Sequence, residues 1–97
     1  MKFEWDEKKN STNILKHSVS FSEVALIFAD SGILSIFDEE NSDLEDRWIS
    51  LGRHPNGNLY VVVHTYRINN NIEYVRIISA RRATRNETIN YYKRNAK

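Results

Sequence analysis

The spacing of apolar residues changes near residue 33 and divides the chain into a helical part and a strand part. Before this point, the sequence predicts a helix over residues 6–17, with Asp6 as a plausible N-cap. A second helix is predicted over residues 21–29, because Ser20 and Glu23 form a capping box ahead of apolar residues at helical spacing. The chain therefore opens with two predicted helices.

After residue 33, short runs rich in β-branched and aromatic side chains alternate with turn residues, as is typical of strands. Four antiparallel strands are predicted, at residues 33–37, 47–53, 59–67 and 72–80. Asparagine and glycine residues between them tolerate the positive φ of tight hairpins, so a meander is expected. A second capping box, Thr84 with Glu87, then predicts a helix to about Arg94.

This order predicts an α+β fold with two N-terminal helices, a four-stranded antiparallel meander sheet and a C-terminal helix. The helices are expected on one face of the sheet, which leaves the other face open to receive a ligand. The length of 97 residues fits one domain over residues 1–97.

Composition narrows the class of protein. Hydrophobic residues make up 40% of the chain and charged residues 28%, which is typical of a globular protein. The chain has no cysteine, which excludes disulfides and thiolate metal sites. No apolar run approaches the roughly 20 residues that span a bilayer, and the first six residues lack the apolar stretch of a signal peptide. We therefore expect a cytoplasmic protein without a membrane partner.

The net charge is only +1, but the charges are unevenly distributed along the chain. Six acidic residues lie between positions 38 and 46, whereas seven basic residues and a single acid lie between 76 and 97. The basic segment can attract the phosphates of a nucleic acid. The solvated face of an ordinary surface helix would show the same pattern, so this distribution alone does not decide the function.

Several side chains have the chemistry for cleaving RNA through its own 2′-hydroxyl, which requires a base, an acid and cations near the phosphate. The catalytic candidates are Glu45 as base, His17 for proton transfer, and Arg67 with Arg76 for the phosphate. A hairpin brings Arg67 and Arg76 together across the predicted sheet. Alternatively, these two arginines lie at the rim and pair with Glu45 or Glu73.

Further residues are candidates for contacts with RNA phosphates or bases: Arg47, Arg81, Arg82, Lys16 and Tyr91. Arg47 shares a strand face with Glu45, and we expect Trp48, on the other face, to be at least half-buried. Arg81 shares a face with Arg76 only if the strand ends or bulges near Ser79. Lys16 and His17 end the first helix, where the macrodipole favours cations, so a purely local role is also open.

The two adjacent tyrosines of the last helix cannot both face the sheet. We expect Tyr92 to join the core with Ile89, which leaves Tyr91 free to stack on a base or to lie exposed on the helix surface. The three histidines are dispersed and lack a nearby carboxylate at metal-ligand spacing. The sequence therefore predicts no metal site and no cofactor.

Ordered motifs run along nearly the whole chain and resemble those of the BrnT family of ribonuclease toxins from type II toxin–antitoxin systems. The motifs are Phe3-Glu4-Trp5-Asp6 with Lys9 and Asn10; Asn13, Lys16-His17 and Val19-Ser20-Phe21; Asp46-Arg47-Trp48 with Leu51-Gly52; and Arg76 to Ala83, followed by Glu87 and Tyr91. The sequence departs from the family pattern at Ser18, where a glycine is common.

The resemblance implies a compact RelE-like fold and a metal-independent endoribonuclease that acts on RNA and inhibits translation. It also implies a cognate antitoxin, usually a ribbon-helix-helix protein, in a complex with two copies of each chain. The residues alone also allow a function of a different class. In that alternative the chain is a non-enzymatic module that binds a protein or a nucleic acid on its open sheet face.

Overall fold

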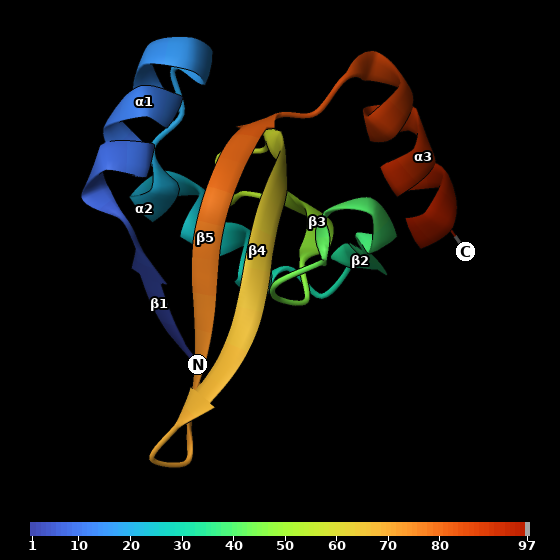
Figure 1. Cartoon of the computed structure of the whole chain (residues 1–97). Coiled ribbons are helices and arrows are strands. Elements are labelled where there is room, and N and C mark those ends of the chain that lie inside the picture. The colour runs from blue at the N-terminus through green and yellow to red at the C-terminus, as the bar shows by residue number, and fades with distance from the viewer. Residues whose placement is uncertain (97) are drawn as a thin grey trace.

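Five strands form one mixed sheet in the computed structural model, which describes residues 1–96 (Figure 1). The strands are β1 (Lys2–Trp5), β2 (Leu34–Phe37), β3 (Trp48–Arg53), β4 (Leu59–Asn69) and β5 (Ile72–Arg82). Their order across the sheet is β1-β5-β4-β3-β2. The pair β1 and β5 is parallel, whereas the other neighbouring strands are antiparallel.

The predicted architecture is wrong, because the chain begins with a strand and the sheet is mixed. β1 has only four residues, too few for a clear period, and its partner β5 lies about seventy residues further along the chain. Of the two predicted N-terminal helices, the first is present, but the second is not a regular α-helix. The second is a single turn, α2 (Phe21–Val24), that continues as the 3-10 helix η1 (Ala25–Ala29).

The two longer helices begin at the predicted caps. α1 (Glu7–His17) starts after Asp6, whose side chain accepts a hydrogen bond from the Lys8 backbone at 2.8 Å. It ends at Ser18, which has a left-handed φ of 55°, the conformation that glycine adopts without strain. α3 (Arg85–Asn95) starts at the Thr84–Glu87 capping box. A short 3-10 helix, η2 (Glu39–Asn41), lies between β2 and β3.

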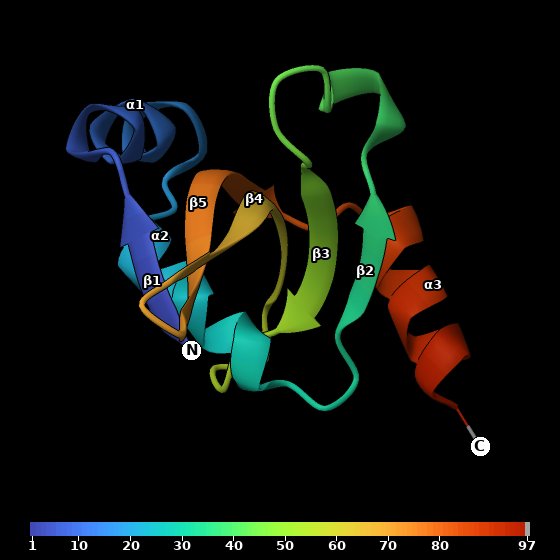
Figure 2. The same ribbon diagram turned by 60° about the horizontal axis from the view of Figure 1, so that its bottom comes forward.

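Helices pack on both faces of the sheet rather than on one (Figure 2). On one face, α2 and η1 bury an apolar cluster with β4 and β5: Phe21, Val24, Ile27, Tyr60, Val62, Val75 and Ile77. On the other face, α3 packs through Tyr91 against Leu51, Leu59 and Val61. α3 covers this second face over β2, β3 and the start of β4, so the part over β1 and over the hairpin end of β4 and β5 has no helix on it.

α1 is fixed to the outer edge of β5 by the buried side chain of Asn13. Its Nδ2 donates to the carbonyl oxygens of Val19 at 2.9 Å and Ala80 at 2.8 Å. Its Oδ1 accepts from the Ala80 backbone N–H at 3.0 Å. One amide side chain thus replaces a neighbouring strand at a position that β1 does not reach.

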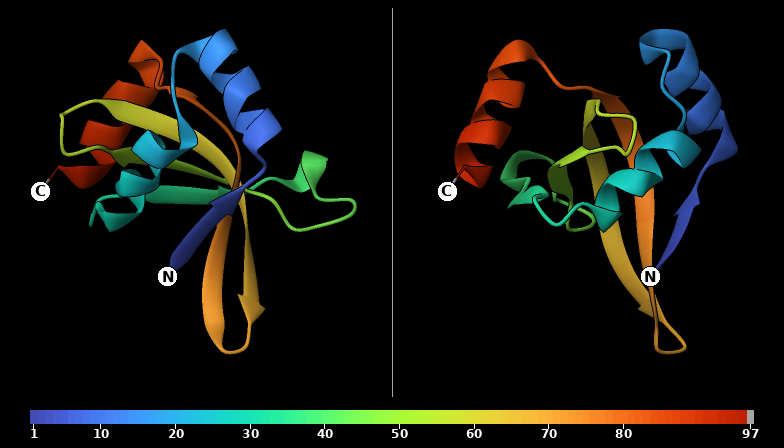
Figure 3. Two further views of the ribbon diagram at one scale, coloured as in Figure 1. Left: turned by 90° about the vertical axis from the view of Figure 1, so that its left-hand side faces the viewer. Right: turned by 180° about the vertical axis from the view of Figure 1, so that it is seen from behind.

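A bulge in β5 changes which side chains share a face. Val63 pairs with Ser79, but the next residue of β4, His64, pairs with Ile77, so Ile78 is the extra residue. Arg76, Ser79 and Arg81 consequently lie on the same face of the sheet. The β4–β5 hairpin turns at Asn70 and Asn71, both with positive φ, and extends beyond the other strands (Figure 3).

The helices of residues 1–96 are all too short or too polar to cross a bilayer.

Replacing Asn13 by Ala should lower the free energy of unfolding by about 1–3 kcal/mol, because two buried carbonyl oxygens and the buried Ala80 N–H lose their partner. Urea unfolding followed by circular dichroism measures this change. Ser11→Ala, at an exposed position of the same helix, is the matched control and should stay within about 0.5 kcal/mol of the parent. Equal stability of the Asn13 and Ser11 variants would contradict the structural role of Asn13.

Candidate functional site

A row of polar side chains crosses the uncovered part of the second sheet face. Glu4 of β1 lies opposite Arg76 of β5, and Arg76 lies opposite Thr65 of β4. By strand alternation, Arg47, immediately before β3, points to the same side. We call the surface formed by Arg47, Arg67, Arg76 and Arg81 the arginine face.

Arg67 and Arg76 meet at the carboxylate of Glu4. Arg67 donates from Nε to Oε1 at 2.5 Å and from Nη2 to Oε2 at 2.9 Å, whereas Nη1 of Arg76 lies 3.9 Å from Oε2. The hydrogen bond from Arg67 is the main cause that holds the pKa of Glu4 below its ordinary value. The structure thus brings the two predicted arginines together, with Glu4 as their partner in place of Glu45 or Glu73.

Glu4 is a site residue that was not predicted from the sequence. Its position on the face follows from β1, which was not predicted to be a strand. The available signal was the alternation of Phe3, Glu4 and Trp5, because the two aromatic residues pack on the core side and the acid faces the opposite way.

Glu45 and Arg47 lie at the β3 border of the arginine face. Glu45 is exposed in the loop before β3, and its Oε1 is 3.6 Å from Nη2 of Arg47. The Nε of Arg47 is buried, and no hydrogen-bond partner for it occurs among residues 1–96. Trp48 is half-buried on the other face of the sheet, with its ring 5.4 Å from that of Phe37.

The bulge gives Arg81 the same orientation as Arg76, whereas Arg82 points to the other face. Arg81 donates two hydrogen bonds to Glu87 of α3, at 2.7 and 2.9 Å. This contact, more than any other, lowers the pKa of Glu87 to about 2. Arg82 instead donates to Oδ1 of Asn58 at 2.9 Å, so the structure does not bring it to the arginine face.

His17 and Lys16 approach the arginine face from the end of α1. A hollow of about 370 Å³ is lined by His17, Ser79, Arg81 and an apolar floor from β3 and β4. The hollow places His17 at the β5 border of the face, across the sheet from Glu45. Asn10 lies seven residues before His17 on the same side of α1. Its Oδ1 accepts a hydrogen bond from the Phe21 backbone N–H at 2.9 Å, so Asn10 has a structural role.

The other two histidines lie away from the arginine face. His64 is fully buried under Phe28, and its Nε2 lies 2.6 Å from Oγ of Ser50. Burial lowers the pKa of His64 to about 4, so it stays neutral near pH 7. His54 lies in the β3–β4 turn, where its Nδ1 accepts from the Asn56 backbone. Within residues 1–96, no three His, Asp or Glu side chains gather closely enough to hold a metal ion.

The structure contradicts the predicted exposure of Tyr91. Tyr91 is only 4% exposed, whereas Tyr92 is 48% exposed. The hydroxyl of Tyr91 donates to Oδ2 of Asp30 at 2.6 Å. Burial, together with this hydrogen bond, raises the pKa of Tyr91 to about 12. Tyr91 therefore fixes α3 to the sheet and is not available to stack on a base.

Comparisons with known proteins give a family match and a structural match. A family model described as "Ribonuclease toxin, BrnT, of type II toxin-antitoxin system" matches residues 5–87. The crystal structure of the Brucella abortus ribonuclease toxin BrnT superposes with a TM-score of 0.61 and covers 88% of this chain and 99% of that chain. The two sequences are 24% identical, so this likeness supports the fold alone. No curated protein matches the chain.

The Arg81–Glu87 pair should make stability depend on pH between 4.5, the ordinary pKa of Glu87, and about 2. Because folding lowers this pKa, the pair stabilises the protein above that interval and loses its contribution as the pH falls through it. Thermal unfolding followed from pH 2 to pH 6 measures the effect. Glu87→Gln should weaken the dependence of the unfolding temperature on pH, whereas Glu39→Gln, at an exposed position, should not. Parallel curves for the parent and Glu87→Gln would contradict the pair's contribution.

Proposed function

Because this chain belongs to the BrnT family of type II toxin–antitoxin systems, and is therefore a ribonuclease toxin, we propose that its arginine face binds and cleaves RNA. The family resemblance seen in the sequence is confirmed by the match over residues 5–87. The family assignment also favours the enzyme over the alternative of a non-enzymatic binding module. The proposal concerns where and how the cleavage takes place.

One observation carries the proposal: Arg67 and Arg76 come from different strands and converge on one point of an uncovered face. Glu4 binds Nε and Nη2 of Arg67, which fixes the direction of that side chain. Arg76 lies 3.9 Å from the same carboxylate, too far for a hydrogen bond, so its donors can contact a phosphate. Glu4 is thus a positioning residue for the two arginines.

Proton transfer requires groups on either side of the bound phosphate. We assign the base to Glu45, held by Arg47 at the β3 border, and the acid to His17 at the β5 border. These borders are separated by two strand spacings, about 10 Å, which leaves room for a nucleotide between them. The 2′-oxygen loses its proton to Glu45 and attacks phosphorus. The bond to the 5′-oxygen then breaks, and this oxygen takes a proton from His17.

This reaction leaves a 2′,3′-cyclic phosphate on one fragment and a 5′-hydroxyl on the other. It uses only groups of the protein and the RNA, so we propose that cleavage proceeds without a metal ion or cofactor. Arg67, Arg76 and Arg47 stabilise the charge that develops on the phosphate.

A type II system implies an antitoxin partner and an RNA target. We further propose that the antitoxin is of the ribbon-helix-helix type and forms a complex with two copies of each chain. The proposed place of action is the cytoplasm, where the chain's lack of cysteine is compatible with reducing conditions.

Replacing Arg67 or Arg76 by Ala should lower the cleavage rate by about 10²-fold or more, the effect of removing one preorganised donor in an active site. Lys at either position should restore little activity, because it cannot make the planar two-donor contact. Initial rates on a fluorescent RNA measure the change. Arg94→Ala, at the far end of α3, should cleave like the parent. Full activity of both arginine variants would exclude the arginine face as the active site.

An RNA with a single 2′-deoxy substitution at the cut site should resist cleavage at that site, because the attacking oxygen is missing. The unmodified RNA should be cut at the same rate in buffer containing EDTA. Gel analysis of end-labelled RNA, with phosphatase treatment of the products, identifies the cyclic phosphate. Cleavage of the 2′-deoxy site, or loss of activity in EDTA, would contradict the mechanism but leave the family assignment intact.

A further inference from the structure

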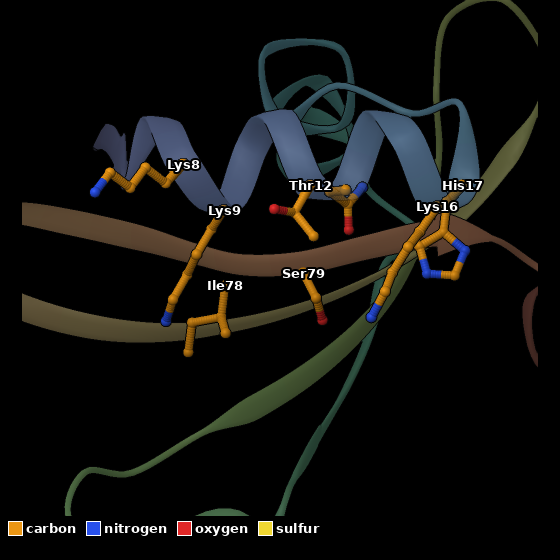
Figure 4. A pocket seen from close by; sticks show the side chains of 8 residues that line it. Lys8, Lys9, Thr12, Lys16, His17, Ile78 and Ser79 are labelled. Carbon is orange, nitrogen blue, oxygen red and sulfur yellow. The ribbon is translucent and has the colours of Figure 1, made fainter.

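A row of cationic side chains follows α1 above the outer edge of β5. Lys9, Thr12 and Lys16 are spaced i, i+3 and i+7, so they share one face of the helix. Figure 4 shows them pointing from α1 toward Ile78 and Ser79 of β5. Together with Lys8 and His17, these residues line a pocket of about 290 Å³. We call it the lysine pocket.

The lysines of the pocket are not paired with an acid in the part of the chain that the structure describes. The lining of the pocket contains lysine, histidine, hydroxyl, amide and isoleucine side chains but no carboxylate. Arg67 and Arg81, in contrast, are each paired with an acid. The electrostatics of this pocket therefore favour an anionic ligand.

The chemistry of the pocket favours phosphates over an acidic protein segment. Lysine ammonium groups and the hydroxyls of Thr12 and Ser79 are typical donors to phosphate oxygens. A protein interface would require an apolar centre, usually with aromatic residues, but Ile78 is the one apolar side chain in the lining. Lys9 and Lys16 are separated by about 10 Å along the helix, which suits more than one phosphate of an extended strand.

The lysine pocket is continuous with the arginine face. His17 and Ser79 line both this pocket and the hollow beside Arg81. The bulge at Ile78 turns Ser79 to the same side as Arg76, so a strand on the arginine face can pass over the edge of β5 toward α1. We propose that Lys9 and Lys16 bind RNA phosphates that flank the cleaved one. This inference rests on the proposed function of the arginine face.

The double variant Lys9→Gln/Lys16→Gln tests the proposal through binding alone. The probe is a mixed-sequence single-stranded RNA with 2′-O-methyl groups, which cannot be cleaved through the 2′-oxygen, and fluorescence anisotropy gives Kd over a series of salt concentrations. Loss of two phosphate contacts should lower the slope of log K against log salt by about 1.4, and the affinity at low salt by about tenfold. Lys93→Gln/Arg94→Gln, with the same loss of charge on α3, should leave the slope unchanged.

Cleavage kinetics test the position of the subsite. With a long RNA, the Lys9/Lys16 variant should raise KM and leave kcat unchanged, whereas with a dinucleotide both constants should match the parent. An equal loss on the dinucleotide would place the lysines at the cleaved phosphate and overturn the proposal. Unchanged RNA affinity would also overturn it. If a polyglutamate peptide loses affinity while the RNA does not, the pocket binds an acidic protein instead.

Failure of this inference is distinguishable from failure of the proposed function. The binding measurement uses RNA that is not cut, so its result does not depend on which residues perform the cleavage. Normal salt dependence in the Lys9/Lys16 variant would remove the lysine pocket and leave the arginine face as proposed. Cleavage that survives substitution of Arg67 and Arg76 would exclude the arginine face as the active site and leave the lysine pocket as an RNA-binding site.

Discussion

The backbone groups at one strand edge need hydrogen-bond partners, and this requirement positions both β1 and α1. The outer edge of β5 carries backbone groups that must be paired, and β1 pairs with it only as far as Ile77. Beyond the bulge, the side chain of Asn13 takes over at Ala80. The first partner brings Glu4 next to the arginines, and the second brings the cationic row of α1 next to them. Both sides of the candidate site therefore depend on how this edge is completed.

Local pairing determines where positive charge remains available. The net charge of +1 does not show that the cationic side chains fall into two groups, one paired with acids and one unpaired. Glu4 and Glu87 each bind an arginine through two hydrogen bonds and thereby fix its direction. Arg76 and the lysines of α1 have no such contact within residues 1–96. An incoming polyanion therefore meets some cations that are held in place and others that are free to adjust to it.

The sequence predicted the structure best where a feature depends on residues close together in the chain. Asp6 and the Thr84–Glu87 capping box marked the starts of α1 and α3, because capping depends on residues within one turn. The convergence of Arg67 and Arg76 followed from a hairpin. β1 was missed because its strand conformation depends on a partner far away in the chain, and Glu4 was missed with it. The predicted orientation of α3, with Tyr92 in the core, was wrong. The Tyr91 hydroxyl donates a hydrogen bond to Asp30, a contact that helix periodicity does not reveal.

The extra residue at Ile78 also bears on how mutation can inactivate such a toxin. It keeps Ser79 and Arg81 on the side of Arg76, although their spacing in sequence would place Arg81 opposite. Insertion of a single codon between Val63 and His64 would give Ile78 a partner and restore regular pairing between β4 and β5, while turning Arg81 away from Arg76. A cell under selection to escape its own toxin thus has a route that keeps the reading frame and leaves every arginine in the sequence. Such a change would disrupt the site through the register of two strands, without replacing any side chain of the arginine face.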